Sequence, residues 1–473
     1  MPTSAPRRFA EISAVRSAEA ARVMMRRAVV LGGSMAGLMA ARVLSDHAEE
    51  VLIVERDDTA ASEKTRPGVP QGSQVHALLS AGAVQLERWF DGFIAEAVDA
   101  GAVVPPSDGS RAHMYFNGVL RPCPATGTDI PALICTRPFL EGLVRRRTLG
   151  LANVRQVRGR ADAVVLDGDR VVGARYLPQG AEQVVTVDAE LVVDAMGRAS
   201  RLSEWLADNG WERPPMRRMP IKLNYATAMF AYDEGISDLW SIVSQAGAAA
   251  TPDGRARIGG CLRVEGGRWI LLISGYDDDR PSAGVDDFEQ RCRRDFPAVF
   301  GDIAKKATMI SDVVTYHQAD SRRRDFHELR RLPAGIVAAG DAVASFNPVY
   351  GQGMTSAMLH ASCLSQYLCA QPSLREPAFD YFSGVRVVVD AAWQMSTLAD
   401  LELPHVNGPY PRGYAVLRWL SGLVFQASAT NRAVNHRLTR ITMMLSHPRS
   451  LLTPGTIVRA LSARAGRGRS WDA

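Results

Sequence analysis

Apolar residues near the start of the chain fall into two short runs separated by a segment of small and apolar residues. Residues 28–31 (Ala-Val-Val-Leu) and 51–54 (Val-Leu-Ile-Val) have the length and continuous apolar character of buried strands. Residues 34–47 lie between them and have the pattern of a helix rather than the alternation of a strand. The order of strand, helix and strand predicts a β-α-β unit and therefore a parallel sheet.

The pattern changes further along the chain. Residues 152–196 predict strands joined by tight turns, and residues 221–276 predict longer strands whose apolar residues alternate, as in a sheet with one exposed face. A short apolar strand over 336–339 leads through a glycine-rich turn into a helix over 355–369, and the remainder is mainly helical. These changes predict an α/β protein with a discontinuous core, an inserted β-rich domain and a helical C-terminal region. We expect the core to comprise residues 26–105, 133–205 and 331–372, and the inserted domain to comprise residues 106–132 and 206–330. Residues 373–473 are expected to form the helical region, and residues 1–25 a disordered leader.

Composition and charge exclude several classes of protein. Of the 473 residues 47% are hydrophobic and 22% charged, which is ordinary for a globular protein and excludes a disordered or fibrous chain. The formal net charge is only +5, so we expect no nucleic-acid partner. The six cysteines form no C-x-x-C pair and no zinc-ligand spacing, which predicts no metal site and favours a reducing compartment, the cytoplasm.

The sequence contains no stretch with the length and apolar character of a membrane-spanning helix. Residues 342–374 are uncharged but are interrupted by Asn, Pro, Gly, Gln and His, and residues 28–41 are too short. Residues 414–425 contain Arg418 as their single charge, and three placements stay open for them: on a membrane surface, over a pocket, or against the core. We take packing against the core as the simplest interpretation, and keep a weak peripheral membrane contact as an alternative.

The turn after the first strand carries a glycine-rich motif, Leu-Gly-Gly-Ser-Met-Ala-Gly at 31–37. Gly32 permits a tight turn, Ser34 is small enough for the backbone to approach a pyrophosphate, and Gly37 lets the next helix pack on the sheet. Glu55 ends the second strand 23 residues after Gly32, where an acidic side chain accepts hydrogen bonds from an adenosine ribose. Together these features predict dinucleotide binding without separating NAD from FAD.

Two further motifs follow predicted strands. Asp194 ends an apolar strand and precedes Gly197 in a turn, which by itself is explained by capping of the next helix. Asp341 follows the strand over 336–339 and can accept bonds from a chain of sugar-like hydroxyls. The segment Pro-Val-Tyr-Gly-Gln-Gly-Met at 348–354 exposes backbone N–H groups at a helix N-terminus, which stabilises negative charge such as that at the N1–O2 edge of a reduced flavin. The third motif therefore favours a flavin nucleotide.

In this order the three motifs resemble those of the single-component FAD monooxygenases of the p-hydroxybenzoate-hydroxylase fold, over residues 27–372. The resemblance implies a Rossmann-like FAD-binding domain with a β-sheet substrate domain inserted in it. More narrowly, the chain is similar to a bacterial branch that includes the flavin epoxidases of polyether antibiotic biosynthesis, of the monensin and lasalocid type. The segments that carry this similarity are 66–71 with 76–79, 135–140, 265–269, 321–324 and 341–354. The chain departs from the pattern at Ser34, where glycine is expected, and at Ser73-Gln74, where the branch more often has Arg-His.

The resemblance implies a set of cofactor-binding residues. Those near the pyrophosphate, the adenosine ribose or the flavin are Gly32, Gly33, Ser34, Met35, Ala36, Gly37, Glu55, Arg56 and Arg137; those shared by FAD and pyridine-nucleotide contacts are Asp194 and Gly197; and those at the ribityl chain and the isoalloxazine edge are Gly340, Asp341, Gly351, Gly353 and Met354. No single catalytic side chain is assigned, and the candidate region is the flavin-edge loop with Pro348, Gly351, Gln352 and Gly353.

For the reaction, the resemblance implies reduction of FAD by NADPH or NADH, capture of O2 as a hydroperoxide at carbon 4a of the flavin, and transfer of the distal oxygen. The predicted function is epoxidation or hydroxylation of an apolar natural-product intermediate, polyketide-like or terpenoid-like. A phenol substrate would benefit from a base, for which His76, His113 and Tyr350 are candidates.

Other functions stay open for a chain with these motifs. One is a flavin-dependent reductase or dehydrogenase of the geranylgeranyl-reductase type, a second is an aromatic, phenol-type hydroxylase, and a third is an FAD-binding scaffold without activity. A flavin halogenase is disfavoured because the sequence has no W-x-W-x-I-P segment.

Apolar residues of the inserted sheet supply a candidate substrate wall. They are Tyr225, Met229, Trp269, Leu271 and Ile273, with Pro348 of the flavin-edge loop. The expected partners are a hydrophobic small-molecule substrate and, if the chain does not reduce its own flavin, a separate flavin reductase. The arginine clusters at 145–147 and 322–324 are expected to be solvated.

Overall fold

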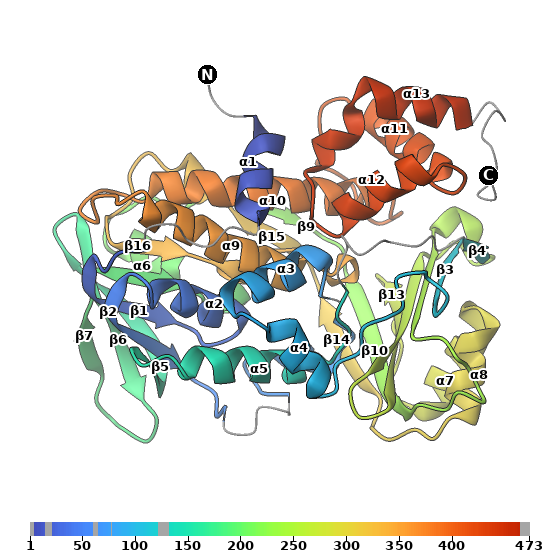
Figure 1. Cartoon of the computed structure of the whole chain (residues 1–473), viewed down its shortest axis with the longest axis horizontal. Coiled ribbons are helices and arrows are strands. Elements are labelled where there is room, and N and C mark those ends of the chain that lie inside the picture. Colours follow the sequence, from blue (N-terminus) through green and yellow to red (C-terminus); the bar gives the residue numbers. More distant parts are fainter. Residues whose placement is uncertain (1–3, 15–20, 60–64, 77, 122–131, 464–473) are drawn as a thin grey trace.

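The computed structural model describes residues 4–14, 21–59, 65–76, 78–121 and 132–463 (Figure 1). Parts of the predicted leader, inserted domain and C-terminal region lie outside these ranges. The described chain forms a larger lobe on the left of Figure 1, a second lobe at the lower right, and a group of helices at the upper right.

The larger lobe is built on a seven-stranded sheet with the order β16-β8-β1-β2-β5-β6-β7. The strands from β16 to β5 pair in parallel, whereas β5, β6 and β7 pair antiparallel. The bounds are β1 (Met25–Leu31), β2 (Ala48–Glu55), β5 (Val154–Asp167), β6 (Arg170–Pro178), β7 (Val185–Asp188), β8 (Leu191–Asp194) and β16 (Ile336–Ala338). Residues 28–31 and 51–54 are buried on both faces of the sheet, which is why they form continuous apolar runs.

Helices from distant parts of the sequence pack on this sheet. The helix α2 contacts both α5 and α9, and α9 in turn contacts α3 and α10. Their bounds are α2 (Met35–Leu44), α3 (Ser80–Trp89), α4 (Phe93–Asp99), α5 (Arg137–Leu149), α6 (Leu202–Asp208), α9 (Gln352–Cys369) and α10 (Phe379–Asp400).

The second lobe contains another seven-stranded sheet, with the order β14-β10-β13-β12-β11-β3-β4. One face is covered by α7 (Val285–Asp295) and α8 (Ala298–Lys306), whose Phe288 and Phe300 pack in one buried cluster with Phe230 and Trp269 of the sheet. The strands are β3 (Ala112–Phe116), β4 (Val119–Arg121), β10 (Leu223–Ala231), β11 (Ser241–Ala246), β12 (Arg257–Val264), β13 (Arg268–Tyr276) and β14 (Val314–Gln318).

Smaller elements join the two lobes. A three-stranded sheet has the order β17-β15-β9, with β9 (Met216–Met219), β15 (Ser321–Arg324) and β17 (Ala344–Ser345). The described 3-10 helices are η1 (Pro70–Ser73), η2 (Gly197–Ala199), η3 (Ala248–Ala250), η4 (Phe326–Glu328), η5 (Gly340–Ala342), η6 (Pro348–Tyr350) and η7 (Pro448–Leu452).

The helices at the upper right of Figure 1 are α11 (Tyr414–Ala427), α12 (Arg432–Thr442) and α13 (Pro454–Ser462). They enclose a small apolar cluster of their own, which includes Leu423 and Val424 of α11. Only the second half of α11 is packed in this way, because Val416 and Trp419 in its first half are 60% and 51% exposed. Residues 414–425 therefore do not pack against the core of the large lobe as expected: the second half packs within the C-terminal helices, and Val416 and Trp419 in the first half are exposed.

The prediction of a disordered leader is wrong for residues 5–13. These residues form α1 (Ala5–Ser13), in which Phe9 and Ile12 are fully buried against the large lobe, and α1 contacts α9 and α10. The spacing of Phe9 and Ile12 places both on one face of a helix, and burial of that face orders the segment. Arg8 adds a hydrogen bond from Nη1 to Ser383 Oγ, at 2.8 Å.

The described residues include neither a membrane-spanning helix nor a cluster of metal ligands. No helix in this part of the chain is long and apolar enough to cross a membrane. No group of three or more His, Cys, Asp or Glu side chains among the described residues has the arrangement of a metal site.

Candidate functional site

The three sequence motifs converge at one edge of the large sheet. The register pairs Leu31 of β1 with Val54 of β2 and with Asp194 of β8, and Asp194 with Ala338 of β16. Since these strands are parallel, the residue that follows each of them lies at the same carboxyl edge, where open α/β sheets bind ligands.

A cleft of about 590 Å³ runs along this edge and continues to β10 and β14 of the second sheet. Its volume lies within the range of small-molecule and cofactor sites. The predicted site residues that line it are Gly32, Ser34, Met35, Ala36, Glu55, Arg56, Arg137, Gly197, Gly340, Asp341, Pro348, Gly351, Gly353 and Met354, together with Tyr225. Gly33, Gly37, Asp194 and Gln352 do not line the cleft.

Two glycines of the first motif are required by close approaches of the backbone. Gly32 has a φ of +103°, and a Cβ atom added to it would lie 2.4 Å from the carbonyl oxygen of Ala195. A Cβ atom on Gly37 would lie 1.8 Å from the carbonyl oxygen of Gly32. Gly37 therefore acts by letting α2 start directly beside the turn, which aims the N-terminus of α2 at the cleft.

Ser34, the departure from the glycine pattern, connects the turn to α5. Its hydroxyl donates to Glu141 Oε2 at 2.7 Å and accepts from Arg137 Nη2 at 3.1 Å. A glycine at this position has no side chain for either bond. The departure thus fixes Arg137, a cleft residue, relative to the first motif.

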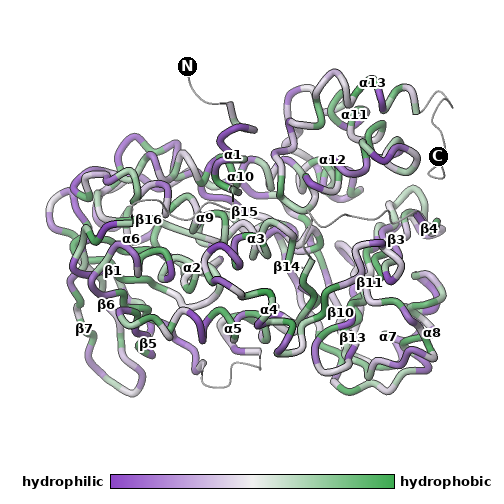
Figure 2. Tube along the Cα trace, viewed as in Figure 1, coloured by the Kyte–Doolittle hydropathy of each residue, from purple (hydrophilic) through white to green (hydrophobic). Residues whose placement is uncertain are grey.

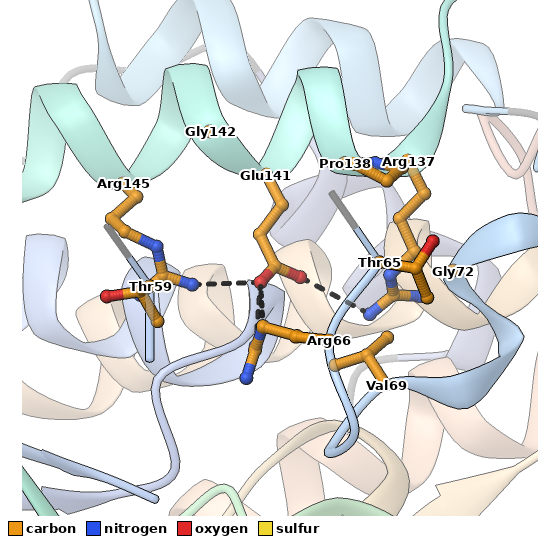
Figure 3. A pocket seen from close by; sticks show the side chains of 10 residues that line it. All are labelled: Thr59, Thr65, Arg66, Val69, Gly72, Arg137, Pro138, Glu141, Gly142 and Arg145. Carbon is orange, nitrogen blue, oxygen red and sulfur yellow. Dashed lines mark hydrogen bonds and ion pairs between the residues drawn. The ribbon is translucent and has the colours of Figure 1, made fainter. Parts of the chain in front are cut away.

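Glu141 is the centre of a buried ionic cluster next to the cleft (Figure 3). Arg66 donates to Glu141 Oε1 through Nε at 3.0 Å and Nη2 at 2.7 Å, and Arg145 donates to the same oxygen at 2.8 Å. Burial by itself favours the neutral acid, but the charges of Arg137, Arg66 and Arg145 outweigh it and lower the pKa of Glu141. Arg145 is buried in this cluster, which corrects the expectation that it is solvated, whereas Arg146 is exposed as expected. Arg323 and Arg324 of the second arginine cluster are buried as well.

Glu55 faces the first motif as the sequence predicted, and protein groups already bind both of its oxygens. Oε2 accepts from the backbone N–H of Gly33 at 2.7 Å, and Oε1 accepts from the N–H of Asp57 at 2.9 Å and lies 3.2 Å from Arg66 Nη1. A carboxylate has about four lone-pair positions, so acceptor capacity remains on the side that lines the cleft.

Asp194 holds a turn and does not face the cleft. It is fully buried, with Oδ1 accepting from the N–H of Met196 at 3.0 Å and Oδ2 accepting from the hydroxyl of Ser200. Burial raises the pKa of Asp194 to about 6, against the effect of these bonds. The alternative of a capped turn describes this side chain better than a direct cofactor contact does, while Gly197 at the same turn does line the cleft.

The third motif places an acid and a helix N-terminus at the middle of the cleft. Asp341 lines it, and burial raises the pKa of Asp341 although Arg137, Arg198 and a hydrogen bond with Ser345 act in the opposite direction. Gly351 has a φ of +66° and directly precedes α9, so the turn and the first N–H groups of the helix stand beside Asp341. Gln352 is buried behind this turn.

These residues fit an FAD molecule. Arg137, bonded to Ser34 at the start of α2, lines the cleft together with Arg66, which suits a diphosphate. Arg137 Nε is also a buried donor that has no hydrogen-bond partner among the described residues. Glu55 and Asp341 are acceptors at separate positions along the cleft, suited to the hydroxyls of a ribose and of a ribityl chain.

The far end of the cleft lies against the second sheet, and its residues differ in part from the predicted substrate wall. Tyr225 lines it, but Met229, Trp269, Leu271 and Ile273 do not. Trp269, Leu271 and Ile273 belong to the cluster under α7 and α8, on the opposite face of the sheet. Met229 packs with Val264 and Ile270. Alternate residues of a strand face opposite sides of the sheet. Because Tyr225 pairs with Ser274, Ser274 and Leu272 of β13 are on the same side as Tyr225, whereas Leu271 and Ile273 are on the other side.

Asp400, at the end of α10, is a buried acid near this end of the cleft that the sequence did not single out. Its Oδ1 accepts from Asn347 Nδ2 at 2.7 Å and from the hydroxyl of Tyr350 at 3.2 Å. Burial raises the pKa of Asp400 to about 7, and the two hydrogen bonds only partly oppose this. Asn347 lines the cleft next to Pro348, so Asp400 positions the flavin-edge loop from behind.

The proposed bases have different surroundings. His76 lines the cleft, but burial and the charge of Arg137 lower the pKa of His76 to about 3, so its ring is neutral. His113 does not line the cleft, and its ring contacts Tyr115. Tyr350 also lies outside the lining, and it reaches the site through Asp400. Gln74, where the related branch has histidine, lines the cleft and accepts a hydrogen bond from Thr227 at 2.5 Å.

The pKa of Asp400 predicts a pH-dependent stability. The ordinary pKa of this group is 3.8 and the folded value is about 7, so the folded protein binds a proton that the unfolded chain has released. Stability therefore falls as the pH rises through this interval, and Asp400→Asn, which stays neutral, lacks that fall. Between pH 5 and pH 8 we expect the unfolding free energy of the wild type to fall by about 2 to 3 kcal/mol more than that of the variant. Urea unfolding of both proteins measures this, and a constant difference between them would show that Asp400 does not titrate there.

Comparison with known proteins agrees with this site. The chain belongs to the protein family described as FAD binding domain, which it matches over residues 26–373. Protein Rv3254 of Mycobacterium tuberculosis (strain ATCC 25618 / H37Rv) is 33% identical over 398 residues, covering 81% of this chain and 82% of that protein. Kynurenine 3-monooxygenase of Salinispora arenicola (strain CNS-205) is 24% identical over 411 residues, covering 78% of each. Among solved structures, flavin-dependent brominase Bmp2 has a TM-score of 0.66 at 15% identity, covering 93% of this chain and 98% of that one, a likeness of fold alone.

The predicted fold and cofactor are thereby confirmed. The chain is an FAD-dependent flavoprotein of the monooxygenase class, and such enzymes use NAD(P)H and O2. Its large lobe carries most of the cleft described above, and the second sheet closes one end of that cleft.

Proposed function

We propose that the protein inserts one oxygen atom of O2 into an apolar, uncharged organic substrate, with NADPH or NADH as the electron donor. The observation that carries this proposal is the chemistry of the far end of the cleft. The residues there are Gln74, Val75, Tyr225, Tyr316, Gln318, Phe346, Asn347 and Pro348, and none of them carries a charge. Such a wall desolvates an apolar substrate with aromatic and aliphatic side chains. The charges that act on Tyr316 from outside this set of residues are those of Arg198, Asp341 and Arg137.

The residues of this region would stabilise charge and exclude water during the reaction. When bound, FAD supplies the redox chemistry that activates O2. The turn at Gly351 and the N-terminus of α9 stabilise negative charge that develops beside them. Tyr225 and Phe346 exclude water from the substrate, and neutral His76 adds no competing charge.

Within this class we propose epoxidation or hydroxylation of a polyketide-like or terpenoid-like intermediate. The segments similar to the polyether epoxidases support it, and three of them, 66–71 with 76–79, 135–140 and 341–354, contribute residues to the cleft. Direct attack of an alkene on an electrophilic oxygen needs no base, which suits a wall without an ionised side chain. A cytoplasmic location fits five described cysteines that are all free thiols.

Hydroxylation of a phenol is the second candidate. It is favoured by Asp400, whose pKa near 7 is that of a proton acceptor at physiological pH and which contacts the cleft residue Asn347. Because Asp400 lies behind the wall, a proton would have to reach it through Asn347 or a water molecule.

A substrate panel distinguishes these functions. Apolar polyenes and neutral phenols are given to the FAD-loaded protein while NAD(P)H oxidation, O2 uptake and product mass are followed, with and without an added flavin reductase. We expect O2 uptake coupled to addition of one oxygen atom to an alkene, and a changed KM in Tyr225→Ala but not in Met229→Ala, its neighbour outside the cleft. Coupled turnover of phenols alone selects the second candidate. Hydrogenation of the substrate without O2 uptake would establish the reductase alternative instead, and a need for the added reductase would identify that partner.

A further inference from the structure

Residues 403–463, which we call the C-terminal unit, differ in charge from the rest of the chain. They contain seven arginines and no aspartate, glutamate or lysine. The whole chain has 55 basic and 50 acidic residues, so the residues outside this unit hold 48 basic and 50 acidic ones. The excess positive charge of the protein therefore lies entirely in this unit.

The C-terminal unit also exposes large apolar side chains. Val416 and Trp419, one helical turn apart on α11, are 60% and 51% exposed, and Val458 on α13 is 61% exposed. Tyr410, Leu452 and Leu461 are exposed as well. In Figure 2 the unit accordingly contains both hydrophobic and hydrophilic segments. Exposed apolar residues of this size, accompanied by arginine and not by acidic residues, are typical of surfaces that insert between lipid headgroups.

The unit is attached beside the substrate end of the cleft. Leu403, Val406 and Tyr414 at its start pack in one cluster with Tyr225, which lines the cleft. Phe425 of α11 stacks edge-on against Phe116 of β3, with ring centroids 4.6 Å apart, and Arg121 of β4 covers the same ring. The C-terminal unit is thus anchored to the sheet that closes the cleft, while the first half of α11 is exposed.

We propose that the C-terminal unit docks the protein on an anionic lipid surface. The charge of the unit selects this partner. A second copy of the unit would bring arginines against arginines, whereas anionic headgroups neutralise them and the acyl region accepts Trp419 and Val416. Nucleic acid would meet the arginines but would leave the aliphatic side chains without an apolar environment. The docking goes beyond the proposed oxygenation, and it brings the cleft close to the phase in which an apolar substrate dissolves.

Vesicle sedimentation tests the proposal with the full-length, FAD-supplemented protein. We expect binding to vesicles of phosphatidylcholine with one third phosphatidylglycerol, at least tenfold weaker binding to phosphatidylcholine alone, and a similar loss in 0.5 M NaCl. Val416→Ser with Trp419→Ser should reduce binding at least tenfold, and Arg412→Gln with Arg432→Gln and Arg459→Gln should do the same. These positions are exposed, so both variants should keep the fold and the FAD content of the wild type.

Matched substitutions on the large and second lobes provide the controls. Val119→Ser with Val285→Ser removes two exposed valines, and Arg213→Gln with Arg330→Gln and Arg375→Gln removes three exposed arginines, all outside the unit. The controls should bind vesicles as the wild type does. Equal binding by all proteins, no binding to anionic vesicles, or binding to duplex DNA or self-association in place of vesicles would overturn the proposal. FAD content and oxygen uptake are measured separately, so failure of docking is distinguishable from failure of the proposed function.

Discussion

Asp341→Ala is expected to be purified with little FAD. The Asp341 side chain lines the middle of the cleft, where burial raises its pKa while Arg137, Arg198 and a hydrogen bond with Ser345 act in the opposite direction. A hydrogen bond to a charged group contributes about 1.5 to 3 kcal/mol, so loss of the acceptor should raise the dissociation constant for FAD roughly tenfold to a hundredfold. Titration of the apoprotein with FAD, followed by flavin fluorescence, measures the change.

Two further variants separate loss of a ligand contact from loss of structure. Asp341→Asn keeps an acceptor oxygen and should lose less affinity than Asp341→Ala. Asp279→Ala breaks buried ion pairs with Arg257 and Arg291 in the second lobe and should lower stability while leaving the ratio of FAD to folded protein unchanged. If Asp341→Ala retained the wild-type affinity, the ribityl assignment would be wrong.

Gly37→Ala is expected to lose both stability and cofactor. The added Cβ atom would stand 1.8 Å from the carbonyl oxygen of Gly32, and neither backbone can move without separating α2 from β1. Overpacking of this kind costs about 3 kcal/mol or more, and the displaced helix N-terminus no longer faces the diphosphate. Urea unfolding and the flavin absorbance of the same preparation report the two effects.

Gly422→Ala is the matched control for this substitution. Gly422 lies in α11 with no atom within 4 Å of an added Cβ, so alanine there should be neutral or stabilise by up to about 1 kcal/mol. A Gly37→Ala protein with the stability of the wild type would contradict the close packing of α2 on the first turn.

Much of the FAD-binding fold could be predicted because its strands are buried on both faces. Continuous apolar runs such as 28–31 and 51–54 mark strands of a parallel sheet, and the topology of such a sheet brings their carboxyl ends together. Hence Gly32, Glu55 and Asp341, which are far apart in the sequence, could be assigned to one cleft before their positions were known.

The substrate wall was predicted less well for a physical reason. Both faces of β13 are apolar, one against α7 and α8 and the other toward the cleft, so the sequence does not distinguish Leu271 from Leu272. Only the pairing of β13 with β10 decides the face, and a shift by one residue reverses it.

Two groups of polar residues near the cleft were not predicted from the sequence. Glu141 and Arg145 follow the predicted residue Arg137 at intervals of four on α5, a spacing that places all three on one helix face and that could have identified the cluster around Glu141. Asp400 gave no such signal, because it meets Asn347 only through the packing of α10 behind the flavin-edge loop. The amphipathic pattern of α1 was likewise present in Phe9 and Ile12, although short.

The absorbance spectrum of the purified protein, before and after anaerobic addition of NADPH or NADH and then after exposure to air, tests the central claim most directly. We predict a bound oxidised flavin that is bleached by one of the two donors and recovers in air with consumption of O2. A folded, FAD-supplemented protein that retains no flavin would contradict the assignment of the cleft, and a reduced flavin that stays bleached on exposure to air would contradict the oxygenase function.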